Sequence, residues 1–329
     1  SQVSPDGARE GFEKVLLQGY DILYIAFSSG LSGTYNSGVI AANELIEKYP
    51  DTEEARAALV GIKNIYIDRN KVDDYFAYVA SLNLSSESSE SAQDSVFYIA
   101  AEKQYMSGAT DSDRPFLDYL NRYPEGNFVN NALFYLAEYY YSKGTYTRAL
   151  EYYSKVCSRP DNIFTEQALL KAGELTFNAG NFHPSLEYFQ RLEGIASTKW
   201  NVLKSRAGIM RNYFNLQEHE QTLTAVTALL NTENVTEQMI REARFKAGKS
   251  NYLLSNYAAA LNDLSQTAED TKNAEGAESK YLKAKIFFQT GKFEDCEKEI
   301  MDFISKNTPH QYWLAQSFIL LSDIYLKKN

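Results

Sequence analysis

Long apolar runs are absent from this chain of 329 residues. No run approaches the roughly 18 residues that a membrane-spanning helix needs, so no membrane span is predicted. The longest run near the start, from Ile22 to Phe27, is too short for the core of a signal peptide and lacks a basic flank. Because the sequence begins at Ser1 rather than Met, the earlier removal of a signal peptide stays open.

Cysteine and histidine are scarce, and acidic residues outnumber basic ones. Cys157 and Cys296 stand far apart, and His183, His219 and His310 are scattered. This distribution gives neither a disulfide framework nor the spacing of a metal site. The formal net charge is −10, and an acidic surface repels phosphate backbones. Nucleic acid is therefore not expected as a partner.

Catalytic motifs are missing as well. The sequence has no GxSxG, HExxH, CxxC, Walker or Rossmann pattern. Adjacent carboxylates such as Glu294 and Asp295 lie in patterns typical of solvated helix faces. We therefore predict a protein that is not an enzyme and that holds no metal and no cofactor.

Aromatic residues are abundant, with 25 tyrosines and 18 phenylalanines. Many of these aromatic residues belong to a repeated sequence motif that first appears clearly at Gly144. An aromatic residue follows this glycine at Tyr146, a small residue at Ala149 and a second aromatic at Tyr153. Since tyrosine combines an apolar ring with a polar tip, it suits helix–helix seams and wet interfaces.

The motif recurs every 36 to 38 residues. The residue equivalent to Gly144, where a turn is expected, stands at 180, 217, 255 and 291. Seven positions before each turn stands a small residue, at Ala137, Gly173, Gly248 and Ala284, and only Met210 breaks this series. The pattern predicts antiparallel helix pairs whose backbones approach closely at the small residues. One pair cannot bury its own apolar face, so the pairs must stack.

In these residues the chain resembles the tetratricopeptide repeat family, most clearly at 130–163 and 166–198 and less regularly over 203–232 and 241–303. The resemblance implies an all-α fold, a solenoid of helical hairpins wound into a right-handed superhelix, which binds other proteins. Two less regular units at 53–83 and 93–124, with turns near Asn70 and Gly108, precede these repeats. We expect two irregular repeats in 52–125, five repeats in 126–304 and a capping helix in 305–329.

The first 51 residues differ from the rest. An apolar stretch from Gly19 to Phe27 leads into a loop rich in glycine and serine, which precedes a helical pattern ending at Tyr49. The sequence of this segment resembles part of the DegV family of fatty-acid-binding proteins, whose SSGLSGTY loop helps to hold a lipid carboxylate. The resemblance implies lipid contacts at Ser28, Ser29, Ser32 and Thr34.

The same segment also fits the repeat, because Gly33-Thr34-Tyr35 followed by Gly38 and Ala42 is in phase with the later units. Residues 34–48 are a helix under both interpretations. Residues 21–27 are a strand if the segment is a βα fragment, and a helix if the segment is an atypical N-terminal repeat.

The predicted function is a scaffold that binds a peptide or a partner helix in a concave groove lined by the first helix of each pair. Fatty-acid binding through residues 28–34 is the alternative. Similarity in style to envelope proteins of Bacteroidetes-type bacteria favours the periplasm, and a cytoplasmic location stays open. The groove residues expected from the repeat are Asn131, Phe134, Glu138, Tyr141, Gln167, Leu170, Glu174, Phe177, Lys204, Arg211, Phe214, Phe245, Lys249, Tyr252, Tyr281, Lys285 and Phe288.

Overall fold

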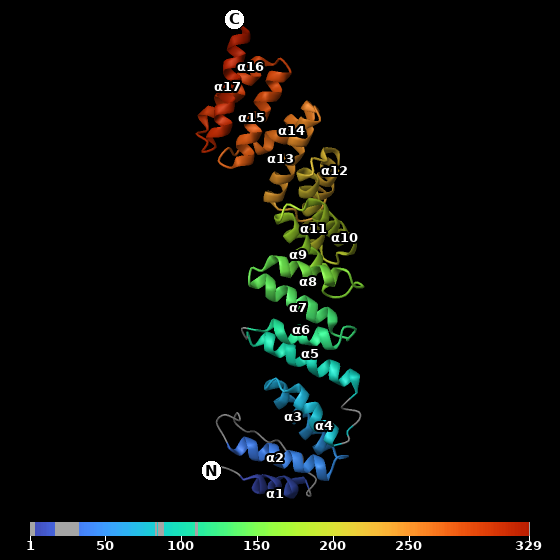
Figure 1. Ribbon diagram of the computed structural model, residues 1–329. Coiled ribbons are helices and arrows are strands. Elements are labelled where there is room, and N and C mark those ends of the chain that lie inside the picture. Colours follow the sequence, from blue (N-terminus) through green and yellow to red (C-terminus); the bar gives the residue numbers. More distant parts are fainter. Residues whose placement is uncertain (1–3, 17–32, 83, 85–88, 109–110, 329) are drawn as a thin grey trace. The chain divides into compact units, whose positions relative to one another are not determined.

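The computed structural model describes residues 4–16, 33–82, 84, 89–108 and 111–328, and over these residues it contains 17 helices and no strand. The all-α prediction is therefore confirmed for this part of the chain (Figure 1). The contested stretch 21–27 lies outside the described residues. Two compact units are distinguished, residues 1–139 and 140–329, and their boundary falls inside one helix.

In its described residues, the first unit contains six helices and most of a seventh. Their bounds are α1 Pro5–Leu16, α2 Gly33–Lys48, α3 Glu53–Asp68, α4 Val72–Ser81, α5 Glu90–Met106, α6 Asp113–Arg122 and α7 Val129–Ser142. Contacts join α3 to α4 and α5 to α6, so the two irregular units predicted at 53–83 and 93–124 are helical hairpins.

The second unit begins within α7 and consists of hairpins followed by a single helix. The bounds are α8 Tyr146–Cys157, α9 Thr165–Asn178, α10 Phe182–Ile195, α11 Lys199–Asn215, α12 His219–Leu230, α13 Glu237–Leu253, α14 Tyr257–Thr267, α15 Ala274–Gln289, α16 Phe293–Ser305 and α17 Gln311–Lys328. Each helix contacts the next one in sequence, and α9, α11, α13, α15 and α17 also contact one another in that order.

Every predicted turn contains a residue in the left-handed region of backbone space. The glycines at 108, 144, 180 and 291 have φ between 72° and 77°, and Asn70, Gln217 and Ser255 have φ between 54° and 62°. At the six of these turns where the next residue is described, its amide closes the helix end, as where the Asn181 N–H donates to the Thr176 carbonyl at 2.9 Å. This is the hydrogen bond of a Schellman turn, which satisfies carbonyls that the helix leaves free.

The small residues allow the close helix approach that the repeat predicts. A Cβ atom on Gly248 would lie 2.6 Å from Cγ of Leu264 on α14, and one on Gly173 would lie 3.0 Å from the Phe189 ring on α10. Met210, which breaks the small-residue series, is nevertheless fully buried. The position seven residues before the turn therefore accepts a buried methionine in this hairpin.

A buried polar network ties the α6–α7 connection to α5. Asp94 is 3% exposed, and its carboxylate accepts hydrogen bonds from the Tyr119 hydroxyl and from the Asn127 N–H, the latter at 2.8 Å. The Phe128 N–H in turn donates to the Tyr119 oxygen at 3.1 Å. Since a buried carboxylate is costly unless it is hydrogen-bonded, these contacts fix the path of the chain into α7.

Helix α1 is a feature that the sequence analysis did not predict. It packs on α2, with Arg9 Nη1 3.0 Å from Glu44 Oε2 and Lys48 Nζ 3.3 Å from Glu13 Oε1. Both pairs join residues 35 positions apart, so α1 and α2 run in the same direction and do not form a hairpin. The available signals were Pro5 at the first helical position and apolar residues at 8, 12 and 16.

We predict that Gln217→Gly stabilises the protein by about 0.5–1 kcal/mol, because glycine adopts a positive φ without the steric cost that a Cβ imposes. Gly180→Ala, the reverse change at the equivalent turn, should destabilise the protein by about 1 kcal/mol. Urea unfolding followed by circular dichroism measures both. Equal midpoints for the two variants would contradict the role assigned to these turns.

Candidate functional site

The predicted groove residues stand at four positions of each first helix, counted back from the turn residue. They lie thirteen, ten, six and three residues before it. Asn131, Phe134 and Glu138 belong to the first unit, and the remaining fourteen belong to the second. The four positions have different environments, and we describe them from the turn backwards.

The residue three positions before the turn is always aromatic: Tyr141, Phe177, Phe214, Tyr252 or Phe288. Four of these rings pack on the first aromatic residue of their own second helix. Ring centroids are 5.5 Å apart for Tyr141 and Tyr146, and 5.6 Å for Phe288 and Phe293. In the third hairpin His219 takes the place of that second ring. These aromatic side chains therefore hold the two helices together at the turn, and each of the five residues is half-buried.

A cation from the following first helix covers most of these rings. Lys171 Nζ lies 4.3 Å from the Tyr141 centroid, and Lys246 Nζ lies 4.2 Å from that of Phe214. Lys327 of α17 lies 4.5 Å from the Phe288 centroid. A cation over a ring face is attracted by the ring quadrupole, so these contacts join successive first helices on the predicted groove face.

The residue six positions before the turn is charged throughout: Glu138, Glu174, Arg211, Lys249 or Lys285. Two of these residues reach the acidic residue of the next first helix. Arg211 donates to Glu242 from Nε at 2.8 Å and from Nη2 at 2.6 Å. Lys249 Nζ donates to Glu278 Oε1 at 2.6 Å. The groove charges between α11 and α15 therefore neutralise one another in part.

Glu242 and Glu278 occupy the fourth position, thirteen residues before the turn, together with Asn131, Gln167 and Lys204. The sequence analysis named the last three and missed the two glutamates, although the phase of the repeat was sufficient to find them. Gln167 is exposed, and Lys204 lies 4.9 Å from the ring centroid of Trp200, which is 54% exposed. Trp200 was also missed, since it lies outside the four positions.

Two predicted groove residues require correction. Phe134 and Phe245, ten positions before the turn, are each only 7% exposed. Phe245 packs with Ala260 and Leu264 of α14 and with Leu282 of α15, so it belongs to the core. At the same position Leu170 is half-buried, and Tyr281 stacks on Trp313 with centroids 5.4 Å apart. This position therefore serves the stacking of helices.

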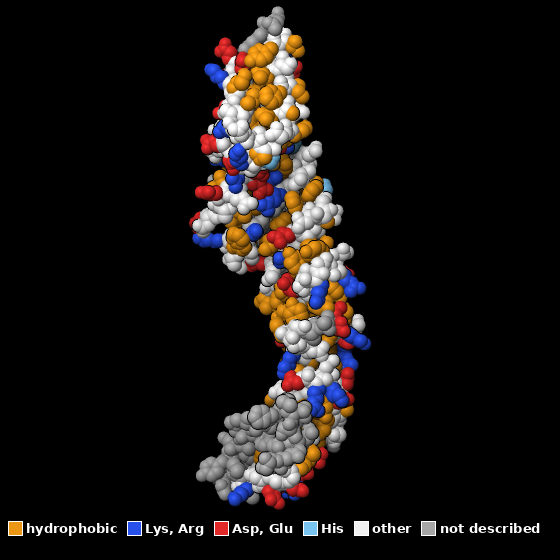
Figure 2. Space-filling model, turned by 90° about the vertical axis from the view of Figure 1, so that its left-hand side faces the viewer, with side chains coloured by type: hydrophobic (Ala, Val, Ile, Leu, Met, Phe, Trp, Pro, Cys, Tyr) orange, Lys and Arg blue, Asp and Glu red, His pale blue; other side chains and the backbone are white. Residues whose placement is uncertain are grey.

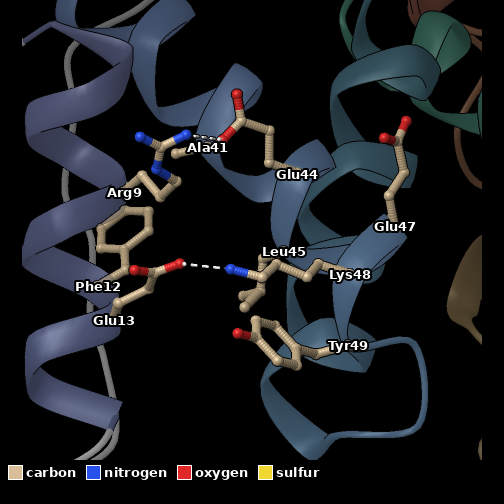
Figure 3. Close-up of a pocket in the computed structure, with 9 residues that line it drawn as sticks. All are labelled: Arg9, Phe12, Glu13, Ala41, Glu44, Leu45, Glu47, Lys48 and Tyr49. Atoms are coloured by element: carbon tan, nitrogen blue, oxygen red, sulfur yellow. Dashed lines mark hydrogen bonds and ion pairs between the residues drawn. The ribbon is translucent and has the colours of Figure 1, made fainter.

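Of the four residues of the alternative lipid site, Thr34 alone lies within the described part of the chain. Ser28, Ser29 and Ser32 lie outside the described residues, and Thr34 stands in the first turn of α2. A pocket of about 490 Å³ does lie between α1 and the C-terminal half of α2 (Figure 3). Phe12, Leu45 and Tyr49 line it together with the Arg9–Glu44 and Glu13–Lys48 pairs. It is distinct from the first turn of α2, where Thr34 lies.

Both cysteines are buried, and neither forms a disulfide. Burial raises the pKa of Cys157 to about 12 and that of Cys296 to about 11. Cys296 is fully buried in a cluster with Ala284, Ile300 and Ile324. In the described part of the chain, no group of three or more His, Cys, Asp or Glu side chains is placed to hold a metal ion. Over the same residues, no helix has the length and apolarity of a membrane span.

Comparison with known proteins bears on the hairpin at α7 and α8. Residues 131–162 match a tetratricopeptide repeat. The resemblance to the tetratricopeptide repeat family, predicted from the repeated motif, is thus confirmed for the unit at 130–163. Solved structures that resemble the chain include a tetratricopeptide repeat protein from Parabacteroides merdae, with 12% identity, coverage of 79% of this chain and 97% of that one, and a TM-score of 0.35. The APC/C hetero-tetramer Cut9–Hcn1 has 14% identity, coverage of 88% and 52%, and a TM-score of 0.40.

The N-terminal resemblance is confirmed as well. Residues 1–62 match the DegV family of uncharacterised proteins, so the match extends past residue 51 into α3. A DegV domain-containing protein of Clostridium perfringens is 54% identical over 65 residues, which is 18% of this chain and 22% of that protein. One from Lactococcus lactis is 42% identical over 53 residues, or 16% and 18% of the two chains. The chain spans about a fifth of the length of these relatives.

We predict that Glu242→Gln destabilises the protein by about 1–3 kcal/mol at neutral pH, because Arg211 and the largely buried Lys246 lose their shared carboxylate. Burial opposes ionisation of Glu242, but the hydrogen bond and charge of Arg211, with the charge of Lys246, lower its pKa below the usual 4.5. The difference from wild type should therefore be complete above pH 4.5 and vanish as the pH falls through the lowered value.

Urea unfolding at several pH values measures this difference. Glu151→Gln is the matched control, since its pair with Lys155 is about half exposed on both sides and such pairs contribute little. Equal losses for the two variants, or a loss that persists at low pH, would contradict the assignment.

Proposed function

We propose that the chain is a non-catalytic scaffold that binds a peptide or a partner helix along the first-helix face of its second unit. The observation that carries the proposal is the uninterrupted contact of α9, α11, α13 and α15, which sets equivalent side chains side by side. The aromatic rings and charged groups of this face recur at constant spacing. An extended peptide or a helix also presents its side chains at regular intervals, so either could match this spacing.

Two cations of this face favour a partner with acidic side chains. Lys285 lies over the rings of Tyr252 and Tyr281, at 5.8 and 5.6 Å from their centroids, and Lys204 lies over Trp200. Among the described residues, neither lysine has a carboxylate within the 4.0 Å of an ion pair. A carboxylate flanked by an apolar side chain would therefore gain both an ion pair and a ring contact at these points.

The test is selection from a random-peptide library displayed on phage against the immobilised full chain. We predict enrichment of peptides with acidic and aromatic residues. Their affinity should fall by about tenfold or more in Lys285→Glu and Lys204→Glu, as for central contacts of an interface. Lys298→Glu on the exposed face of α16 is the control and should bind as wild type does. Failure to enrich any peptide, or equal losses in the control, would overturn the proposal.

The DegV match supports fatty acid as a second candidate ligand. An acyl chain needs an enclosed space of several hundred Å³ with an apolar lining, and the pocket between α1 and α2 has a volume of about 490 Å³. Charged pairs bridge that pocket, and it does not adjoin the start of α2.

We accordingly predict that native mass spectrometry of the purified chain detects no bound long-chain fatty acid. A bound fatty acid that is retained in Lys285→Glu and lost in Ser29→Ala would instead establish lipid binding through the N-terminal segment.

A further inference from the structure

Helix α17 occupies the place of a first helix, and its aromatic side chains at the corresponding positions are partly exposed. Phe318 and Tyr325 follow Tyr281 and Phe288 at the spacing of the repeat, and α17 contacts α15 and α16 as each first helix contacts the hairpin before it. Phe245, the equivalent of Phe318 two hairpins earlier, is 7% exposed, whereas Phe318 is 48% exposed.

The outward face of α17 is a stripe of apolar side chains at helical spacing. Tyr312, Ile319 and Leu326 are 65%, 58% and 74% exposed, and the exposed Ala315 and Ser322 stand between them. Alternating steps of three and four residues give the seam of a helix pair, and small residues within it let two backbones approach. Figure 2 shows the resulting patch of hydrophobic side chains at the C-terminal end.

We propose that this face binds the same face of a second copy of the chain, with the two α17 helices antiparallel about a two-fold axis near Ile319. In that arrangement Ile319 meets its own counterpart and Tyr312 meets Leu326 of the second copy. The arrangement extends the stacking interface already present between first helices, because it covers Phe318 and the stripe as the next hairpin covers Phe245.

Charge favours a second copy in this orientation. Asp323 is the charged residue of α17 nearest the stripe centre, and it lies opposite Ala315 of the second copy. Its own counterpart lies eight residues along the helix, or about 12 Å away, so no like charges meet. A head-to-tail contact is disfavoured, because the outward residues of α1 include Asp6, Glu10 and Lys14, whose charges would be buried against the stripe.

The area involved indicates a reversible dimer. Aromatic side chains bury roughly 150–250 Å² each, so the half-exposed residues of the stripe with Phe318 and Tyr325 offer on the order of 500 Å² per copy. Two such faces reach the lower end of the size range of specific interfaces. Association should therefore depend on concentration in the micromolar range.

Sedimentation velocity of the full chain over a micromolar concentration series tests the proposal. The expected result is a shift from the monomer mass of 37.3 kDa toward twice that mass. Ile319→Glu should abolish the shift, since one substitution places two carboxylates at the axis. Met301→Glu, at an exposed residue of α16, should leave the shift unchanged. A monomer at all concentrations, or a dimer that survives Ile319→Glu, would overturn the proposal.

Oxidative cross-linking tests the orientation. Both native cysteines are buried, so a new surface cysteine reports on its own surroundings. Ile319→Cys should form a disulfide-linked dimer by itself. Tyr312→Cys should cross-link poorly alone and efficiently when mixed with Leu326→Cys. Efficient cross-linking of Tyr312→Cys to itself would indicate parallel helices and contradict the two-fold arrangement.

Discussion

The left-handed residue that ends each first helix is the constraint on which the other features of the repeat depend. Because a positive φ and the following backbone hydrogen bond end the helix at one residue, they fix the phase of every position before it. Three residues back the side chain lies against the second helix, and seven back it faces that helix at close range. Gly144, Gly180 and Gly291 take this conformation without steric cost. Gln217 and Ser255 take it against their intrinsic preference, so the packing of the hairpins must stabilise it there.

The same phase explains why the first-helix face carries so many paired groups. Side chains at equivalent positions of successive helices recur side by side, so long cationic side chains reach the rings and carboxylates of the neighbouring repeat. Arg211 with Glu242 and Lys249 with Glu278 are two instances of one geometric relation. Such pairs hold the face in a defined arrangement, and under the proposed function this order lowers the entropy lost when a partner binds. The proposed partner would gain most where a cation still lacks a carboxylate.

Local signals made most of the fold predictable. The turns at Gly108, Gly144, Gly180 and Gly291 follow from glycine and the helical pattern before it, and those at Asn70, Gln217 and Ser255 follow from the phase of their neighbours. The core role of Phe245 was not predictable from that phase. It depends on how near α14 and α15 approach, a property of packing rather than of spacing. Helix α1 was missed because the apolar stretch after residue 19 dominated the interpretation of the N-terminal segment, although Ala8 and Phe12 stand at helical spacing.

Helix α17 shows how one set of positions has two uses. Within the stack, the aromatic residue ten positions before the turn is covered by the next hairpin, so its ring contributes to stability. On α17 the equivalent Phe318 is about half exposed, and Ile319 and Leu326 are exposed as well, so the same kind of side chain lies on the surface proposed for dimerisation. Each unit of a repeat protein buries its apolar face only against a neighbour. The exposed apolar residues of α17 therefore suit a helical neighbour of the same kind, and the proposed dimer supplies that neighbour from a second copy of the chain.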